Sequence, residues 1–191
     1  MISVLVYIDH SIFYWLYNFS GRSYVLDATI IFFGEYLVYL VILFVFWHLY
    51  RLWRTHKKKA FIPYVEALVS VAIGNGIVVS LFRMFYERVR PYVALHLTHN
   101  LLIDPTFSFP SGHTIFMFAL ATSIFFYDKK FGTFLYICGI LIGVARVAAG
   151  VHYPSDVFAG AIFGVAISMC VYKIFRKTLC RKFWIKSRPA K

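Results

Sequence analysis

The sequence is poor in charge, and above all in acidic residues. Charged residues make up 15% of the 191 positions, with 8 Asp and Glu against 20 Lys and Arg, while 61% of the residues are hydrophobic. This composition excludes an ordinary soluble globular domain and a disordered chain. The few acids are also scattered, which argues against a carboxylate-bound magnesium site. We therefore expect no metal and no cofactor.

Cysteine is scarce as well, and the three that occur do not suggest a disulfide framework. Cys138 and Cys170 fall in apolar segments and Cys180 in a basic stretch. Long linkers, low-complexity segments and repeats are absent, and no alternation typical of a barrel appears. The sequence therefore predicts one domain over residues 1–191.

Long apolar runs dominate what is present. Only helices and closed barrels satisfy their backbone in lipid, and about 17–25 apolar residues suffice for a helix to cross. The predicted spans are 25–50, 62–82, 111–127, 132–150 and 154–175. Pro63 and Pro154 fall in the first turn of their helices, where proline is tolerated. We expect an all-α, integral membrane helical bundle with about five transmembrane helices.

The first 22 residues fit this pattern less well. The stretch "VLVYIDHSIFYWLYNF" is interrupted by Asp9 and His10. We expect residues 1–22 to form an amphipathic helix in the membrane interface, followed by a turn at "SGRS". A sixth span is the alternative.

The basic residues divide into two sets. Fifteen of the 20, including every lysine, lie in 51–59, at 129–130 or in 173–191, which five spans place on one side; residues 176–191 form a basic tail. The positive-inside rule makes that side cytoplasmic, so no nucleic acid partner is needed to explain the charge. Five arginines fall on the opposite face: Arg22, Arg83, Arg88, Arg90 and Arg146. Arginine's planar fork suits phosphate binding.

Three segments converge on that outer face. "LFRMFYERVRPYV" carries Arg83 and Arg90, which a continuous helix ending at Pro91 would bring to one face. "PSGH" makes Ser111 the expected N-cap, so the free N–H groups of the next turn, beginning at Gly112, would face an anion. The further residues of interest are His113, Arg146, His152 and Asp156.

Each feature alone has a plain structural explanation. A single arginine at a helix end usually extends to the lipid headgroups, and a single interfacial histidine is usually a hydrogen-bonded structural residue. The spacing of His152 and Asp156, however, allows the carboxylate to fix the imidazole tautomer. Three arginines, two histidines and a carboxylate on one face favour a site for an anion. The small-residue pairs Gly139/Gly143 and Gly160/Gly164 favour close helix packing.

The segments "RMFYERVRP", "PSGH" and "ARVAAGVHYPSD" together resemble the three-part signature of the type 2 phosphatidic acid phosphatase (PAP2) superfamily, over roughly residues 10–175. Two positions depart from the usual pattern. Arg83 stands where the family usually has lysine, and Ala145 where it usually has serine.

The resemblance implies a catalytic mechanism. His152, held by Asp156, would attack phosphorus to give a phosphohistidine, and His113 would protonate the leaving oxygen. Arg83, Arg90 and Arg146, with Ser111 and the Gly112 N–H, would stabilise the charge on the equatorial oxygens. We expect these residues to surround one pocket, opposite the Lys57–Lys59 loop.

Short loops suggest a lipid substrate, and the sequence looks most like bacterial undecaprenyl-diphosphatases of this superfamily. That implies a multi-pass enzyme of the bacterial cytoplasmic membrane with an extracytoplasmic site. Phosphatidylglycerophosphate, phosphatidate and lipid A phosphate are alternative substrates. An anion transporter and a non-catalytic lipid-binding protein are the rival classes. Four further residues are candidate substrate contacts: Arg88, His96, His99 and Glu35.

Overall fold

A computed structural model describes residues 2–55 and 61–186, so the Lys57–Lys59 loop lies outside the described residues. Every regular element in these two ranges is helical. The elements are α1 (Ile2–Tyr17), α2 (Tyr24–Ile31), η1 (Phe32–Tyr36), α3 (Leu37–Arg54), α4 (Ile62–Val71), η3 (Ala72–Val78), α5 (Val79–Phe85), α6 (Pro91–Ala94), α7 (Gly112–Phe125), α8 (Lys129–Ala148) and α9 (Pro154–Lys186). The expected all-helical membrane fold is confirmed.

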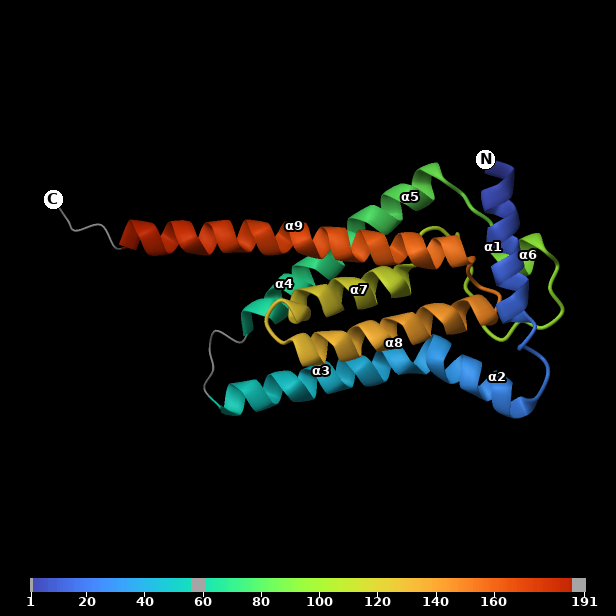
Figure 1. Ribbon diagram of the computed structural model, residues 1–191, viewed down its shortest axis with the longest axis horizontal. Helices are drawn as coiled ribbons and strands as arrows, with labels where there is room; N and C mark the ends of the chain where they lie inside the picture. Colours follow the sequence, from blue (N-terminus) through green and yellow to red (C-terminus); the bar gives the residue numbers. More distant parts are fainter. Residues whose placement is uncertain (1, 56–60, 187–191) are drawn as a thin grey trace.

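Four helices are long and apolar enough to cross a membrane: Tyr24–Arg54, Ile62–Phe85, Lys129–Ala148 and Pro154–Thr178. The segment predicted as the third span is the shorter apolar helix α7, with 14 residues. At 1.5 Å per residue it measures about 21 Å, less than the roughly 30 Å of a bilayer core. Helices α4, α8 and α9 surround α7 (Figure 1), so it need not match the bilayer thickness.

Helix α7 is the centre of the bundle, and its side chains from Met117 to Ile124 are mostly buried. Glycines let α9 approach it closely. A Cβ at Gly160 would lie 2.8 Å from the carbonyl oxygen of Ser111, and one at Gly164 would lie 2.7 Å from that of Ile115. The prediction that this glycine pair packs helices is confirmed, because larger side chains would push α9 off the α7 backbone.

Two of the long helices contain a π-helical turn. The first turn, η1, joins α2 to α3 where Figure 1 shows the helix bending. The second, η3, joins α4 to α5 and contains Asn75. Turns of this kind distort the regular i→i−4 ladder and re-aim neighbouring side chains. Both turns contribute to the site described below.

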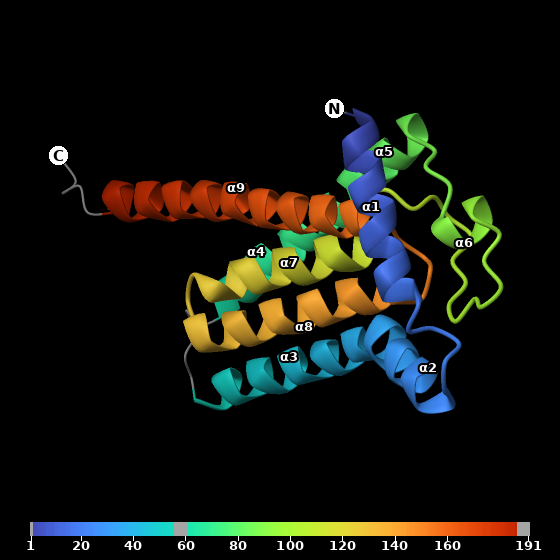
Figure 2. The same ribbon diagram turned by 45° about the vertical axis from the view of Figure 1, so that its right-hand side comes forward.

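Helix α1 does not run along the bundle. In both ribbon views it crosses the end at which α8 stops and α9 begins (Figure 2). Phe13 of α1 is fully buried there, against Tyr153. Away from this contact α1 carries exposed apolar residues such as Leu5, Tyr7 and Trp15. This arrangement is compatible with the predicted position of residues 1–22 in the membrane interface, which stays a prediction.

Candidate active site

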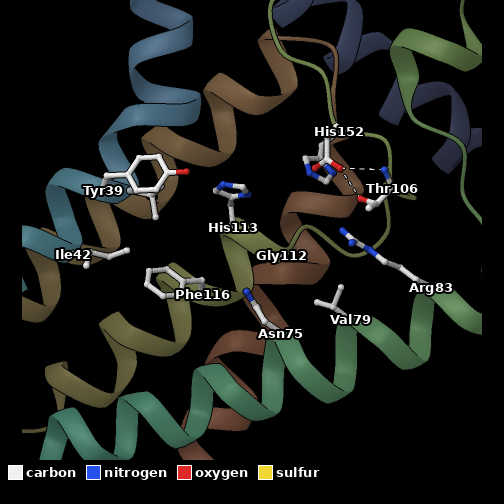
Figure 3. A pocket seen from close by; sticks show the side chains of 12 residues that line it. Tyr39, Ile42, Asn75, Val79, Arg83, Thr106, Gly112, His113, Phe116 and His152 are labelled. Carbon is white, nitrogen blue, oxygen red and sulfur yellow. Dashed lines mark hydrogen bonds between the residues drawn. The ribbon is translucent and has the colours of Figure 1, made fainter.

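A cavity of about 440 Å³ opens at the end of the bundle where α7 begins. Its wall includes four residues expected at the site, Arg83, Gly112, His113 and His152. Figure 3 shows the two histidines directed into the same space, with Arg83 entering from α5. The remaining lining residues are Val38, Tyr39, Ile42, Asn75, Val79, Asp104, Thr106 and Phe116.

Arg83 and Arg90 reach the site by different routes. Helix α5 ends at Phe85, and an irregular segment then leads to Pro91, which is the first residue of α6. The expectation that one helix carries both arginines and stops at Pro91 is therefore wrong. Leaving the helix lets Arg90 turn inward, where it is 2% exposed. The Nε of Arg83 is buried without a hydrogen-bond partner.

The guanidinium of Arg90 is held by the loop that precedes α7. Its Nε donates to the Thr106 carbonyl at 2.7 Å, and its Nη2 donates to the Thr106 hydroxyl at 2.9 Å. Its Nη1 donates to the Val151 carbonyl at 2.8 Å and contacts His152 Nε2 at 3.2 Å. Burial is the main reason that the pKa of Arg90 falls to about 10, so the group remains charged at neutral pH.

The contact with Arg90 defines the tautomer of His152. A guanidinium can only donate, so Nε2 of His152 must accept, and the proton of the neutral ring is on Nδ1. That atom faces Asp156 Oδ2 at 3.7 Å. Burial, with help from Arg146 and Arg90, lowers the pKa of His152 to about 4, although Asp156 acts in the opposite direction. The ring is therefore neutral at pH 7, with an unprotonated Nε2 that accepts from Arg90.

The "PSGH" segment forms the start of α7. Ser111 occupies the N-cap position, but its side chain does not cap the helix; the hydroxyl accepts from the Thr114 hydroxyl at 3.0 Å. The next residue, Gly112, lines the cavity, and a Cβ there would meet nothing closer than Asn75 Nδ2 at 3.9 Å. Packing therefore does not require glycine at this position. The missing side chain instead leaves the helix N-terminus open to the cavity.

Arg146 approaches the site from α8 and is 2% exposed. Its Nη1 donates to the carbonyl of Gly34 at 3.3 Å and lies 3.5 Å from Glu35 Oε2, both residues belonging to η1. Its Nη2 donates to Asp104 at 3.3 Å. The Glu35 carboxylate is thus close to the guanidinium groups of the site, although it does not line the cavity.

Asp104 is a site residue that the sequence analysis missed. Its carboxylate lines the cavity and lies 2.7 Å from Arg90 and 3.3 Å from Arg146. Burial alone would raise its pKa, but hydrogen bonds from Thr106 and the two arginines lower the pKa below its ordinary value. The available signal was the segment "DPT", in which Asp104 Oδ1 accepts from the Thr106 N–H as in an Asx turn.

Like Glu35, the other three candidate substrate contacts do not line the cavity. His99 packs over Gly21, and its backbone N–H donates to the Tyr17 hydroxyl; His96 has a positive φ of 48° in the same irregular segment. Arg88 binds Asp9, Ser155 and Asp156 behind the histidine. Asp9 is a second residue that the sequence analysis missed. A substrate contact by any of these three residues stays a prediction.

These positions define what the site can do chemically. A neutral imidazole presents an unprotonated Nε2 to a cavity that also contains a second histidine, Arg83 and the start of α7. Such a set suits nucleophilic attack on a bound phosphate. Within residues 2–55 and 61–186, no group of three or more His, Cys, Asp or Glu side chains could hold a metal ion.

Comparisons with known proteins agree with this geometry. Residues 63–180 match the PAP2 superfamily model. The chain is 35% identical to a Bacillus licheniformis protein named bacitracin transport permease protein BcrC, over 81% of this chain and 75% of that protein. It is 30% identical to the undecaprenyl-diphosphatase BcrC of Bacillus subtilis, over 86% of this chain and 83% of that protein.

A solved structure has a similar fold. The crystal structure of Aquifex aeolicus LpxE superposes with a TM-score of 0.64 at 27% identity, covering 85% of this chain and 93% of that one. The family match covers all three motif segments, and each segment contributes at least one lining residue to the same cavity. The chain therefore belongs to the PAP2 superfamily, as a multi-pass membrane lipid phosphatase.

Proposed function

We propose that this phosphatase removes the terminal phosphate of undecaprenyl diphosphate. The observation that carries the proposal is the 30% identity to an undecaprenyl-diphosphatase across most of both chains. A groove of about 430 Å³ between α3 and α4 supports it. The groove is apolar along nearly all its length and shares Ile42 and Phe116 with the catalytic cavity. A lipid with a diphosphate head and a hydrocarbon tail fits a polar cavity that adjoins an apolar groove.

In the proposed reaction, Nε2 of His152 attacks the terminal phosphorus. A nitrogen–phosphorus bond forms while the bridging phosphorus–oxygen bond breaks, and undecaprenyl phosphate leaves with the electron pair. His113 supplies a proton to the leaving oxygen as needed. The imidazole becomes cationic, and Asp156, which faces its Nδ1–H, stabilises that charge. Water then attacks phosphorus and gives its proton to the neutral His113; the nitrogen–phosphorus bond breaks, its electron pair returns to Nε2 of His152, and inorganic phosphate is released.

Arg83, Arg90 and Arg146 surround the position of the phosphate in this proposal. Arg83 has the buried Nε without a partner, and Arg90 exchanges its contact with His152 for one to a phosphate oxygen. The N–H groups at the start of α7 add a further positive potential, together with the Ser111 hydroxyl. Asp104 competes with the substrate for Arg90 and Arg146.

We place the site on the outer face of the bacterial cytoplasmic membrane. Basic residues in the described part of the chain gather at the opposite end of the bundle, where α3 ends and α8 begins (Figure 1). They include Arg51, Arg54, Lys129 and Lys130. The positive-inside rule assigns that end to the cytoplasm.

Phosphate release by the purified protein tests the proposal. Undecaprenyl diphosphate is compared with phosphatidylglycerophosphate, phosphatidate and lipid A, and we expect the highest kcat/KM for undecaprenyl diphosphate. Val71→Trp, which fills the apolar groove, should raise KM for this lipid and leave an aryl phosphate unaffected. Val69→Trp, on the same helix but outside the groove, is the control. A higher kcat/KM for another lipid would overturn the assignment.

A further inference from the structure

A polar cluster behind the catalytic pair joins the N-terminal helix to the start of α9. We call Asp9, Arg88 and Ser155 the support cluster. Arg88 comes from the irregular segment after α5, Asp9 from α1 and Ser155 from the first turn of α9. No residue of this cluster lines the catalytic cavity.

Arg88 connects the cluster to the catalytic aspartate. Its Nη1 lies 2.5 Å from Asp156 Oδ1 and 2.7 Å from the Ser155 hydroxyl, and its Nη2 lies 2.8 Å from Asp9 Oδ2. The other oxygen of Asp156 accepts from the Tyr153 N–H at 2.9 Å. Only that second oxygen faces the imidazole of His152, so Arg88 holds the side of the carboxylate that the histidine does not use.

Asp9 fixes the start of α9 from a distant part of the chain. Its Oδ1 accepts from the Ser155 N–H at 2.8 Å, and its Oδ2 accepts from the Ser155 hydroxyl at 2.6 Å. A carboxylate that accepts from a free N–H of the first turn acts as a helix cap. Its negative charge also interacts favourably with the positive end of the helix dipole. Asp156 is the next residue in that turn, so its backbone position depends on a side chain of α1.

Aromatic contacts reinforce the same connection. The guanidinium of Arg88 stacks over the Tyr153 ring at 4.1 Å, and His10 of α1 stacks on the same ring at 5.4 Å. Phe13, one turn further along α1, lies 5.6 Å from it. Tyr153 follows His152 directly. Helix α1 therefore packs against the loop that carries the nucleophile.

Electrostatics gives Arg88 a reason to matter for catalysis. Asp156 is fully buried, and its histidine partner is neutral in the resting state, so the carboxylate needs another cation. Arg88 supplies it. Without that charge, the carboxylate would take up a proton or turn toward another donor, and in either case it would lose its fixed relation to Nδ1 of His152.

We propose that Arg88 and Asp9 are positioning residues for the His152–Asp156 pair, and that α1 thereby supports catalysis. The inference rests on the proposed role of His152 as the nucleophile. The sequence alone made Arg88 a candidate substrate contact, which for a diphosphate substrate would be a contact to the second phosphate. The two roles differ in a measurable way. A positioning residue acts on kcat for every substrate, whereas a contact to the second phosphate acts on a diphosphate alone.

Steady-state kinetics with an aryl phosphate and with undecaprenyl diphosphate separates them. We expect Arg88→Gln to lower kcat about 10- to 100-fold on both substrates, because small misplacements of catalytic groups have effects of this size. KM should change less than about threefold. Asp9→Asn, which is isosteric, should show the same pattern more weakly, and Arg88→Lys should recover part of kcat. The controls are Arg22→Gln and Glu87→Gln, which remove exposed charges.

The double variant Asp9→Asn/Arg88→Gln provides a second readout. The two losses should be clearly less than multiplicative, because both residues act through Asp156. An increase of KM confined to the diphosphate, or wild-type kcat in Arg88→Gln, would overturn the inference. His152→Gln measured in parallel keeps the two hypotheses apart: activity in that variant contradicts the proposed mechanism, whereas inactivity beside a wild-type Arg88→Gln contradicts only the positioning role.

Discussion

The two sides of the catalytic site, which we call its walls, differ in how completely their polar groups are paired. On one wall, Arg90 donates to the carbonyls of Thr106, Phe107 and Val151 and to the Thr106 hydroxyl, and Asp156 is held by Arg88 and Tyr153; of this group only Nδ1 of His152, 3.7 Å from Asp156, has no hydrogen-bond partner among the described residues. On the other, Arg83 has a buried Nε without a partner, and Gly112 leaves a helix N-terminus uncovered. The paired wall holds the nucleophile in place before substrate binds. The unpaired wall keeps hydrogen-bond donors available for the phosphate group of the substrate.

The largest expected effect belongs to the paired wall. His152→Gln should abolish turnover of every substrate, because no phosphohistidine can form without the imidazole. The measurement is phosphate release from an aryl phosphate, a lipid phosphomonoester and undecaprenyl diphosphate. Residual turnover on any of the three at more than trace level would sink the assignment of this residue as the nucleophile.

His113, on the unpaired wall, should behave differently. General acid catalysis contributes about 10²- to 10⁴-fold, but only where the leaving oxygen needs a proton. His113→Ala should therefore reduce turnover of a lipid phosphomonoester strongly, of undecaprenyl diphosphate less, and of an activated aryl phosphate least. Equal losses on all three would indicate that His113 binds phosphate or shapes the cavity instead.

Lysine substitutions at Arg90, on the paired wall, and at Arg83, on the unpaired wall, test the difference between the two walls directly. Arg90→Lys should lower kcat/KM by about 100-fold or more, because a lysine cannot reproduce the forked hydrogen bonds to Thr106 and Val151. Arg83→Lys should retain activity within about tenfold, since the charge is kept, whereas Arg83→Ala should lose it. Comparable inactivation by both lysine variants would show that Arg83 also depends on its geometry.

The smallest effect concerns proton binding by His152. Its imidazole NMR signals, assigned with His152→Gln, should titrate with a midpoint near pH 4. Arg90→Gln should raise this midpoint, because one of the charges that lower the pKa is removed. In the unfolded chain the ring binds a proton below about pH 6.5, so the native state loses stability as the pH falls from there toward 4. A midpoint near 6.5 in the native protein would contradict the buried, neutral ring.

The sequence predicted the residues of the site better than the path of the chain between them. The membrane fold and the start of α7 at "PSGH" followed from apolar runs and local capping rules. The relation of Arg83 to Arg90 did not. Helical spacing favoured one continuous helix, but the buried hydrogen bonds of Arg90 stabilise a chain that leaves the helix after Phe85.

Asp104 and Asp9 were missed for a related reason. Each acts through partners that are distant in sequence: Asp104 meets Arg146 across 42 residues, and Asp9 meets Ser155 across 146. Apart from the Asx turn at "DPT", no local pattern indicates such contacts. Asp9 was noticed only as an interruption of an apolar stretch, and its role depends on α1 crossing the end of the bundle (Figure 2).

The π-helical turn η1 has a consequence for how this chain can tolerate changes in length. A π-helical turn holds one residue more than the α-helical turn it replaces, so deleting a single residue from Phe32–Tyr36 would leave an unbroken helix. That deletion would also remove the wide turn and re-aim its backbone carbonyl groups. The Gly34 carbonyl would then turn away from Arg146, which it now meets at 3.3 Å. The number of residues in this segment is therefore constrained by the guanidinium of Arg146 on α8. A one-residue deletion here should reduce activity more than most substitutions.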